Sequence, residues 1–219
     1  MYLHSHSGNR VEGIQTLLSQ VAGEIALCVF DFSAYGQSQG EYATQGISEI
    51  HDVDAVLRYL EEQKGFRRFY LWGRSMGAVT AIYYASKLLN PPNGRPFKVD
   101  GLILDSPYSD LRELIADQLA EYNVPRFVSA YGIMPILSGT IKEKAGIEVL
   151  DNPPPKSFCD SVRIPVFVMV GEIDKLTKPA EVEEMYHIIP SKQTTHQIPP
   201  RSSIKFLMQS TEIFVHLRR

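Results

Sequence analysis

Short apolar runs alternate along the chain with longer segments whose apolar residues recur at helical spacing. The runs lie at residues 26–30, 69–72, 102–104 and 165–170, and each has the length and near-continuous hydrophobicity of a buried strand. Helical spacing marks residues 51–63, 76–89 and 179–189. Strands of this kind separated by helices predict a mostly parallel sheet with helices on both faces, which is an α/β fold.

The alternation lapses between residues 110 and 155. A helical piece at 111–121 persists there, but the stretch carries five prolines: Pro125, Pro135, Pro153, Pro154 and Pro155. Two interpretations stay open, a small helical cap or lid inserted at 111–155 above the site, or a surface insertion with no gating role. The length of 219 residues suits one domain with a sizeable core, so we take 1–219 as a single unit that includes this insertion.

Composition and charge narrow the class of protein. The chain is 44% hydrophobic and 21% charged, with a net charge of -3 and no basic run, so we expect no nucleic-acid partner. No apolar stretch reaches the roughly 18 to 20 residues that span a bilayer, and residues 1–10 are too polar for a signal peptide. We therefore predict a cytoplasmic protein without an integral membrane segment, of open oligomeric state. Cys28 and Cys159 are expected to be free thiols.

The strongest chemical signal is a G-x-S-x-G sequence formed by residues 73–77, with Ser75 at its centre. It follows the predicted strand 69–72 and precedes the Ala-rich helix. A tight strand–turn–helix places a serine hydroxyl above the sheet, at a helix N-terminus that favours developing negative charge. The plainer alternative is a helix-capping serine in a glycine-flanked turn. The pattern predicts that Ser75 is a nucleophile.

Several segments together resemble the α/β-hydrolase superfamily. LWGRSMGAVTA (71–81) resembles the family's nucleophile elbow, and YLHSHSGNR near the start resembles its first strand and oxyanion loop. FDFSAYGQSQGEY (30–42), LILDSPYSDL (102–111) and VGEIDKLTKP (170–179) follow in the family's order. Within the superfamily the resemblance is nearest to the serine aminopeptidase-like (S33-type) branch, which has acyl-protein thioesterase-like relatives. It implies an α/β-hydrolase fold and a serine hydrolase.

The resemblance also implies an acid and a base, because a serine hydroxyl needs both to become a good nucleophile. Asp174 fits the family's G-x-x-D spacing, and Glu172 is its rival. The chain order Ser, Asp, His makes His196 the expected base. His187 lies too early, within the predicted helix, and His216 is the fallback.

The oxyanion hole needs two backbone N–H groups aimed at the carbonyl oxygen. By resemblance these belong to Met76, directly after the nucleophile, and to His6. The family usually has glycine where this chain has Ser5, and we expect the extra Cβ to restrict the loop. His4 and His6 lack a third ligand nearby, so we predict no metal and no cofactor.

The leading functional hypothesis is hydrolysis of an ester, thioester or amide through an acyl-Ser75 intermediate, on a small-molecule, acyl or peptide substrate. The alternative is a catalytically impaired or dead hydrolase fold used as a binding or scaffold module. Compared with the family, the chain starts inside the first motif, without the family's N-terminal strands, and leaves the family pattern after Lys192. We therefore expect a truncated or mispredicted gene product with a shortened sheet edge, and marginal stability or association.

Overall fold

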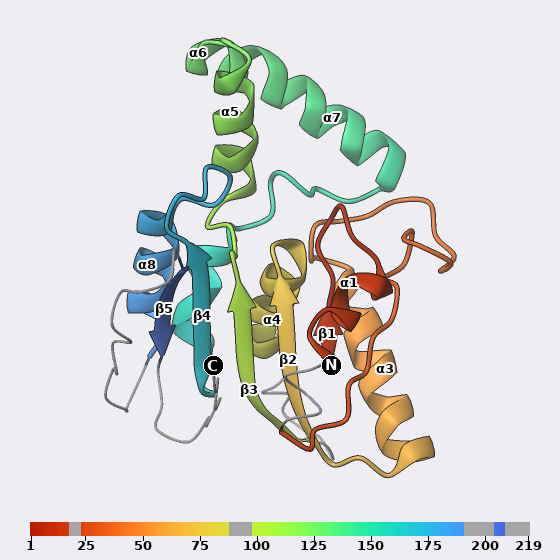
Figure 1. The fold of residues 1–219 in the computed structure, drawn as a ribbon. Coiled ribbons are helices and arrows are strands. Elements are labelled where there is room, and N and C mark those ends of the chain that lie inside the picture. The colour runs from red at the N-terminus through yellow and green to blue at the C-terminus, as the bar shows by residue number, and fades with distance from the viewer. Residues whose placement is uncertain (18–22, 88–97, 191–203, 209–219) are drawn as a thin grey trace.

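A sheet of mainly parallel strands forms the centre of the computed structural model, which describes residues 1–17, 23–87, 98–190 and 204–208. The strands of this described part stand in chain order: β1 (Tyr2–Leu3), β2 (Arg68–Arg74), β3 (Lys98–Asp105), β4 (Val166–Gly171) and β5 (Ile204–Met208). β1 to β4 run parallel, and β5 pairs antiparallel with β4 (Figure 1). The predicted mostly parallel sheet is confirmed.

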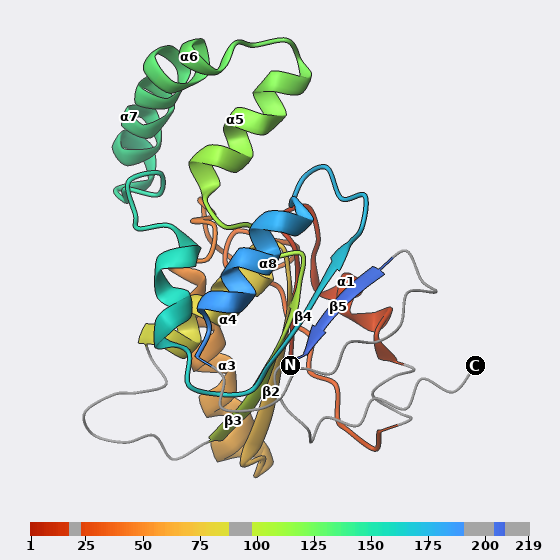
Figure 2. The same cartoon turned by 90° about the vertical axis from the view of Figure 1, so that its left-hand side faces the viewer.

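Helices cover both faces of this sheet. On one face lie α4 (Met76–Lys87), the 3-10 helix η2 (Pro155–Ser161) and α8 (Pro179–Ile188), with α3 (Glu49–Lys64) packed against α4. The short helix α1 (Arg10–Ile14) lies over the other face and contacts β1 (Figure 2). Helix α4 is buried around most of its circumference, as its Ala-rich apolar sequence predicts.

The apolar run at 26–30 behaves differently from the prediction. Only Val29 forms a bridge, an isolated parallel one with Tyr2, although the Tyr2 N–H also donates to the Cys28 carbonyl at 2.8 Å. Its neighbour, strand β1, is only two residues long. Residues 26–30 therefore have too few backbone partners to form a regular strand. The prediction of a strand at 26–30 is therefore wrong in extent.

Four helical pieces rise above the carboxyl ends of the strands and form what we call the arch, residues 111–145 (Figure 1). They are α5 (Leu111–Glu121), α6 (Arg126–Val128), the π-helix η1 (Ser129–Ile133) and α7 (Met134–Ala145). Asp110 caps α5 by accepting the Arg112 N–H at 2.7 Å. Gly146, with a φ of 69°, ends α7.

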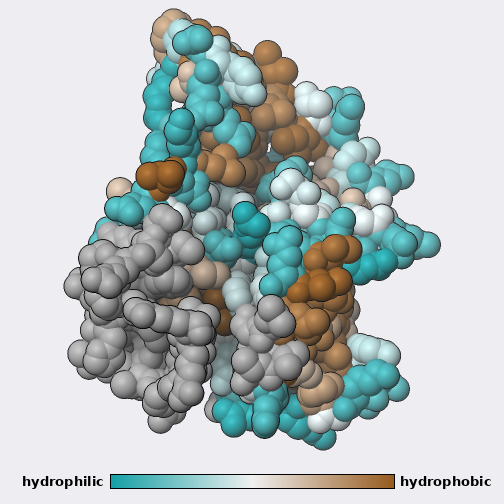
Figure 3. Space-filling view, in the orientation of Figure 1, coloured by the Kyte–Doolittle hydropathy of each residue, from teal (hydrophilic) through white to brown (hydrophobic). Residues whose placement is uncertain are grey.

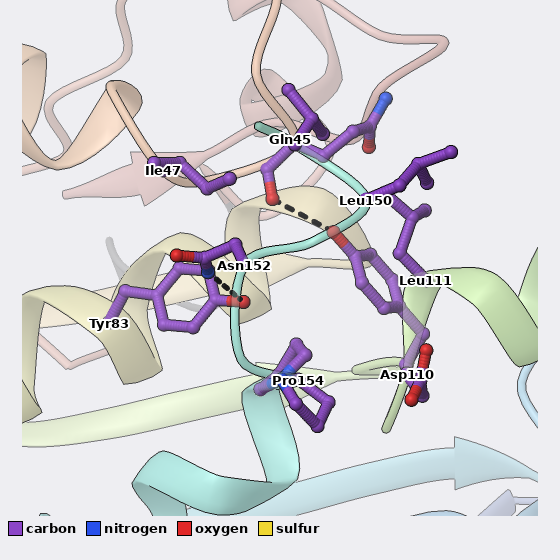
Figure 4. A pocket seen from close by; sticks show the side chains of 11 residues that line it. Gln45, Ile47, Tyr83, Asp110, Leu111, Leu150, Asn152 and Pro154 are labelled. Atoms are coloured by element: carbon purple, nitrogen blue, oxygen red, sulfur yellow. Dashed lines mark hydrogen bonds between the residues drawn. The ribbon is translucent and has the colours of Figure 1, made fainter. Parts of the chain in front are cut away.

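The base of the arch is fastened to the sheet and to α4. The buried Tyr108 hydroxyl donates to the Gln45 carbonyl at 2.8 Å. The Asn152 amide donates to the Tyr83 hydroxyl at 3.2 Å, and that hydroxyl in turn donates to the Pro153 carbonyl at 3.2 Å (Figure 4). Only a cavity of about 10 Å³ is left between these groups. Further out, an ion pair joins Asp117 of α5 to Lys178, directly before α8.

Candidate active site

The turn between β2 and α4 holds Ser75 in a strained conformation. Its φ is 49°, in the left-handed region that side chains rarely adopt. The flanking glycines allow the tight turn: a Cβ on Gly73 would lie 2.2 Å from the Gly77 carbonyl oxygen, and one on Gly77 would lie 2.0 Å from the Leu3 carbonyl oxygen. The Ser75 N–H donates to the Asp105 carbonyl at 2.8 Å, which ties the turn to β3.

Ser75 lines a cleft of about 760 Å³ between the carboxyl edge of the sheet and the arch. Its floor is polar and includes His6, Ser106 and Asp174. Its roof is largely apolar: α5 and α7 line it with Leu111, Leu114, Ile115, Ile141 and Ala145, beside the polar Gln118, Thr140 and Lys144. The cleft therefore offers a hydroxyl at the bottom and a hydrophobic wall above.

Asp174 lies in the turn between β4 and α8, on the same cleft as Ser75. Its Oδ1 accepts the N–H groups of Leu176 and Thr177, each at 2.9 Å, and its Oδ2 accepts the Thr177 hydroxyl at 2.9 Å. These bonds fix the carboxylate against its own turn while Oδ2 keeps a lone pair for a further donor. The rival Glu172 is exposed and does not line this cleft.

The loop after β1 carries the predicted oxyanion donor His6. The Ser5 N–H and Ser5 hydroxyl both donate to Glu12 Oε2 at 2.9 Å, so the N–H of Ser5 is already used. The Tyr2 hydroxyl donates to Glu12 Oε1 at 3.1 Å. Ser5 is not among the described residues with positive φ, so its Cβ imposes no strain there. Instead of distorting the loop, Ser5 anchors it to Glu12.

A second contact holds the His6 side chain. His6 Nδ1 lies 2.6 Å from the Tyr35 hydroxyl and 2.9 Å from the Gln45 side-chain amide. Burial raises the pKa of Tyr35, so this hydroxyl stays protonated. The loop that carries Tyr35 is itself pinned by Asp31, whose carboxylate accepts the N–H groups of Arg10 and Gln37 at 2.7 and 3.0 Å.

His4 is fully buried and its ring serves the fold. Nε2 accepts the Phe32 N–H at 3.1 Å and Nδ1 faces the Ser5 carbonyl at 2.8 Å, so the hydrogen bonds assign the proton to Nδ1. Among the described residues, no group of three His, Cys, Asp or Glu side chains stands close enough to hold a metal ion.

A charged cluster lies directly beside the nucleophile turn. The Arg74 guanidinium stands 3.5 Å from Glu12 Oε1 and 3.8 Å from Asp105 Oδ2. Burial raises the pKa of Asp105, the nearby Arg74 charge lowers it in part, and the negative charges of Glu12 and Asp174 add to the rise. Sequence reasoning missed Glu12, and the one local signal for it is the pair Asn9 and Glu12, an N-cap residue followed three positions later by Glu.

The structure thus brings Ser75, Asp174 and His6 to one cleft, with Met76 at the first position of α4, next to Ser75. His187 is exposed near the end of α8, away from the residues that line this cleft. The predicted base His196 and the fallback His216 lie outside the described residues.

Comparison with known proteins identifies the family. Residues 6–131, more than half of the chain, match the family described as alpha/beta hydrolase fold. The chain therefore belongs to the α/β-hydrolase superfamily. The Pyrococcus furiosus esterase Pf2001 superposes with a TM-score of 0.62 at 23% identity, over 85% of this chain and 66% of that one, which shows the shared fold.

Two curated relatives match parts of the chain. The lysophosphatidylserine lipase ABHD12 of Danio rerio is 29% identical over 115 residues, which is 52% of this chain and 28% of that protein. The uncharacterized protein YqkD of Bacillus subtilis is 28% identical over 160 residues, 72% of this chain and 49% of that protein. The chain spans half or less of the length of these relatives. None of the helices that the structure describes has both the length and the apolar character to cross a bilayer.

Proposed function

We propose that this protein is a serine hydrolase that cleaves carboxylic esters of apolar acyl groups through an acyl-Ser75 intermediate. The observation that carries the proposal is the position of Ser75, in a strained turn at the foot of a cleft with an apolar roof. Strained backbone of this kind persists where the surrounding structure fixes it, and it is common at catalytic groups.

In the proposed reaction His196 takes the proton of the Ser75 hydroxyl as Oγ attacks the carbonyl carbon of the ester. His196 then gives this proton to the leaving alcohol as the C–O bond breaks, which leaves the acyl group on Ser75. Water attacks this acyl ester with His196 again as base, and a carboxylic acid and free Ser75 result. Asp174 orients the imidazole through the remaining lone pair of its Oδ2.

The N–H groups of Met76 and His6 are the proposed oxyanion hole. Met76 begins α4, and the first N–H groups of a helix have no partner within it. The His6 N–H is the next one along the loop after that of Ser5, which Glu12 accepts. Two such donors supply the stabilisation that the tetrahedral oxyanion needs.

The roof of the cleft favours an acyl chain as the recognised group. Leucine and isoleucine side chains of α5 and α7 stand over Ser75, and a hydrocarbon chain would bury itself against them. Thioesters of the same acyl groups fit the same surface. A peptide substrate, as in the aminopeptidase-like branch, would leave its polar backbone against this apolar roof at a cost.

Covalent labelling of the nucleophile tests the proposal. A fluorophosphonate should label the parent and fail to label Ser75→Ala. Ser106→Ala is the matched control, because Ser106 lines the same cleft and also has a positive φ, of 50°. Labelling of Ser75→Ala at the parent rate would refute the assignment of Ser75 as the nucleophile. Turnover of p-nitrophenyl esters of increasing chain length then tests the substrate class, and labelling without turnover of any ester would favour the binding-module alternative.

Separate variants test the proposed base and the proposed acid. His196→Gln should abolish ester turnover, whereas His216→Gln should leave it near that of the parent. Asp174→Asn should lower kcat by orders of magnitude while the protein stays folded, because the amide holds the same turn through its oxygen but cannot stabilise an imidazolium. The reverse outcome for the two histidines would assign the base to His216.

A further inference from the structure

The far end of the arch carries exposed apolar side chains and almost no charge. Residues 122–141 include a single charged residue, Arg126, whereas the chain's average of 21% charged residues would put about four among these twenty. Tyr122, Phe127, Tyr131 and Ile136 are 82%, 66%, 87% and 72% exposed. We call these four side chains the arch tip. A monomeric protein in water seldom exposes such a surface without a use for it.

The single charge at the arch tip is turned back towards the body of the arch. Arg126 donates to Glu113 at 2.9 Å and also pairs with Asp117, both on α5. Asp117 in turn pairs with Lys178. Because the guanidinium is paired on α5, the outer surface of the tip is left to rings and aliphatic groups.

The arch tip continues the apolar roof of the cleft. On α5, Leu114 and Gln118 line the cleft, and Tyr122, the C-cap residue of this helix, follows four residues after Gln118. On α7, Thr140 lines the cleft, and Ile136 precedes it at the same spacing. Figure 3 shows hydrophobic residues gathered in the middle of the arch, beside hydrophilic residues along one limb. A surface of mainly apolar side chains, with Gln118 and Thr140 among them, therefore leads from the tip towards Ser75.

We propose that the arch tip docks on the surface of a lipid bilayer, so that an acyl lipid passes from the membrane along the inner side of the arch to Ser75. Tyrosine and phenylalanine suit the boundary between lipid head groups and acyl chains, where one end of the side chain is apolar and the other is wet. A protein partner of ordinary chemistry would need several charged or amide groups around an apolar centre, and this segment supplies only the amide of Asn123 and the already paired guanidinium of Arg126. The docking step rests only on the exposed side chains of the arch tip. The delivery step rests in addition on the proposed ester hydrolysis.

Vesicle co-sedimentation of the whole chain tests the docking step. The protein is mixed with phosphatidylcholine vesicles, with and without phosphatidylserine, at low and high salt. We expect binding that survives high salt, because the contact is apolar. The double variant Phe127→Ser with Tyr131→Ser should bind about tenfold more weakly or worse, since each exposed ring lost removes apolar area from the bilayer contact.

The matched control removes the same two residue types elsewhere. Tyr59→Ser with Phe66→Ser takes one tyrosine and one phenylalanine, 52% and 44% exposed, from α3 and from the segment before β2, at the opposite end of the strands. This control should bind vesicles like the parent. Equal binding by the arch variant and the parent would overturn the proposal, as would failure of the parent to bind. A parent dimer that the arch variant abolishes would overturn it too, because a second copy would then cover the tip.

Two further readouts separate docking from catalysis. Ser75→Ala should bind vesicles like the parent, so a failure of the serine hydrolase assignment would not be mistaken for a failure of docking. The arch variant should hydrolyse a short water-soluble ester at the parent rate and a vesicle-borne ester at least about tenfold more slowly, in line with its lost binding. Equal losses on both esters would show a damaged fold or site, and delivery along the arch would be rejected.

Discussion

Removal of the Glu12 side chain is the most informative test of how the loop that carries His6, the proposed oxyanion donor, is held. In Glu12→Ala the Ser5 N–H, the Ser5 hydroxyl and the Tyr2 hydroxyl all lose their acceptor. Glu12 itself is only 10% exposed, and Tyr2 is buried, so water reaches these donors poorly. The loop that carries His6 would then have no side-chain anchor at Ser5.

The size of the effect follows from the number of donors and their burial. A hydrogen bond to a charged group contributes roughly 1.5–3 kcal/mol, and these donors share one carboxylate, so we expect a loss of about 2–4 kcal/mol in the free energy of unfolding. The Arg74 contact, 3.5 Å long on a half-exposed guanidinium, adds little. Displacement of one oxyanion donor should lower kcat by a further factor of about 10² to 10³.

Two further variants and two measurements test the anchoring role of Glu12. Glu12→Gln keeps one oxygen for Ser5, so it should retain more activity and stability than Glu12→Ala. Glu62→Ala, at an exposed glutamate of α3, is the control and should change neither. Urea unfolding gives the stability, and the rate of fluorophosphonate labelling of Ser75 reports the oxyanion hole. If Glu12→Ala labels and unfolds like Glu62→Ala, the anchoring role is refuted.

Three other changes probe the turn, the charged cluster and the core. Gly77→Ala puts a Cβ 2.0 Å from the Leu3 carbonyl, so unfolding should become easier by at least about 2 kcal/mol in a urea titration. Because Asp105 has a raised pKa in the fold, its charge costs stability as pH rises, and the melting temperature gained by Asp105→Asn should grow as the pH rises above about 4, the ordinary pKa of an aspartate. Burial raises the pKa of Cys159 to about 12, so in Cys28→Ser protein Ellman's reagent should react only after unfolding.

The tight turn at Ser75 was predictable from sequence because its geometry is local. A positive φ at Ser75 and two glycines that leave no room for a Cβ are properties of five consecutive residues. The role of Glu12 was not predictable in the same way. Its spacing from Asn9 suggests a capping box, in which it would bond back to the Asn9 N–H, yet the fold offers it the Ser5 N–H and hydroxyl instead. Only the tertiary arrangement decides between these acceptor roles.

In the arch, the prolines suggested breaks in helical structure that the fold does not have. Five prolines between 110 and 155 suggested interruption, but residues 126–145 form one helical run. Pro125 stands at the N-cap before α6, where no N–H is needed. Pro135 has no N–H to offer the preceding turn, and there the run widens into the π-helix η1 instead of breaking. The prolines mark where the hydrogen-bond pattern changes, while the helix continues.

The floor of the cleft and its roof are held by different forces, and this difference bears on how the site works. Glu12, Asp31, Glu49 and Asp174 each accept at least two hydrogen bonds from backbone N–H or hydroxyl groups of a nearby loop, which fixes the loops around Ser75. Helix α5 of the roof has no fully buried residue. Leu111 and Leu114 at its start pack against the core, and farther along an ion pair, exposed on the lysine side, joins Asp117 to Lys178. Exposed ion pairs stabilise little, so we expect the arch to shift more easily than the loops that hold Ser75, Asp174 and His6. The geometry that sets the chemical step is thus built independently of the surface that would select the acyl group.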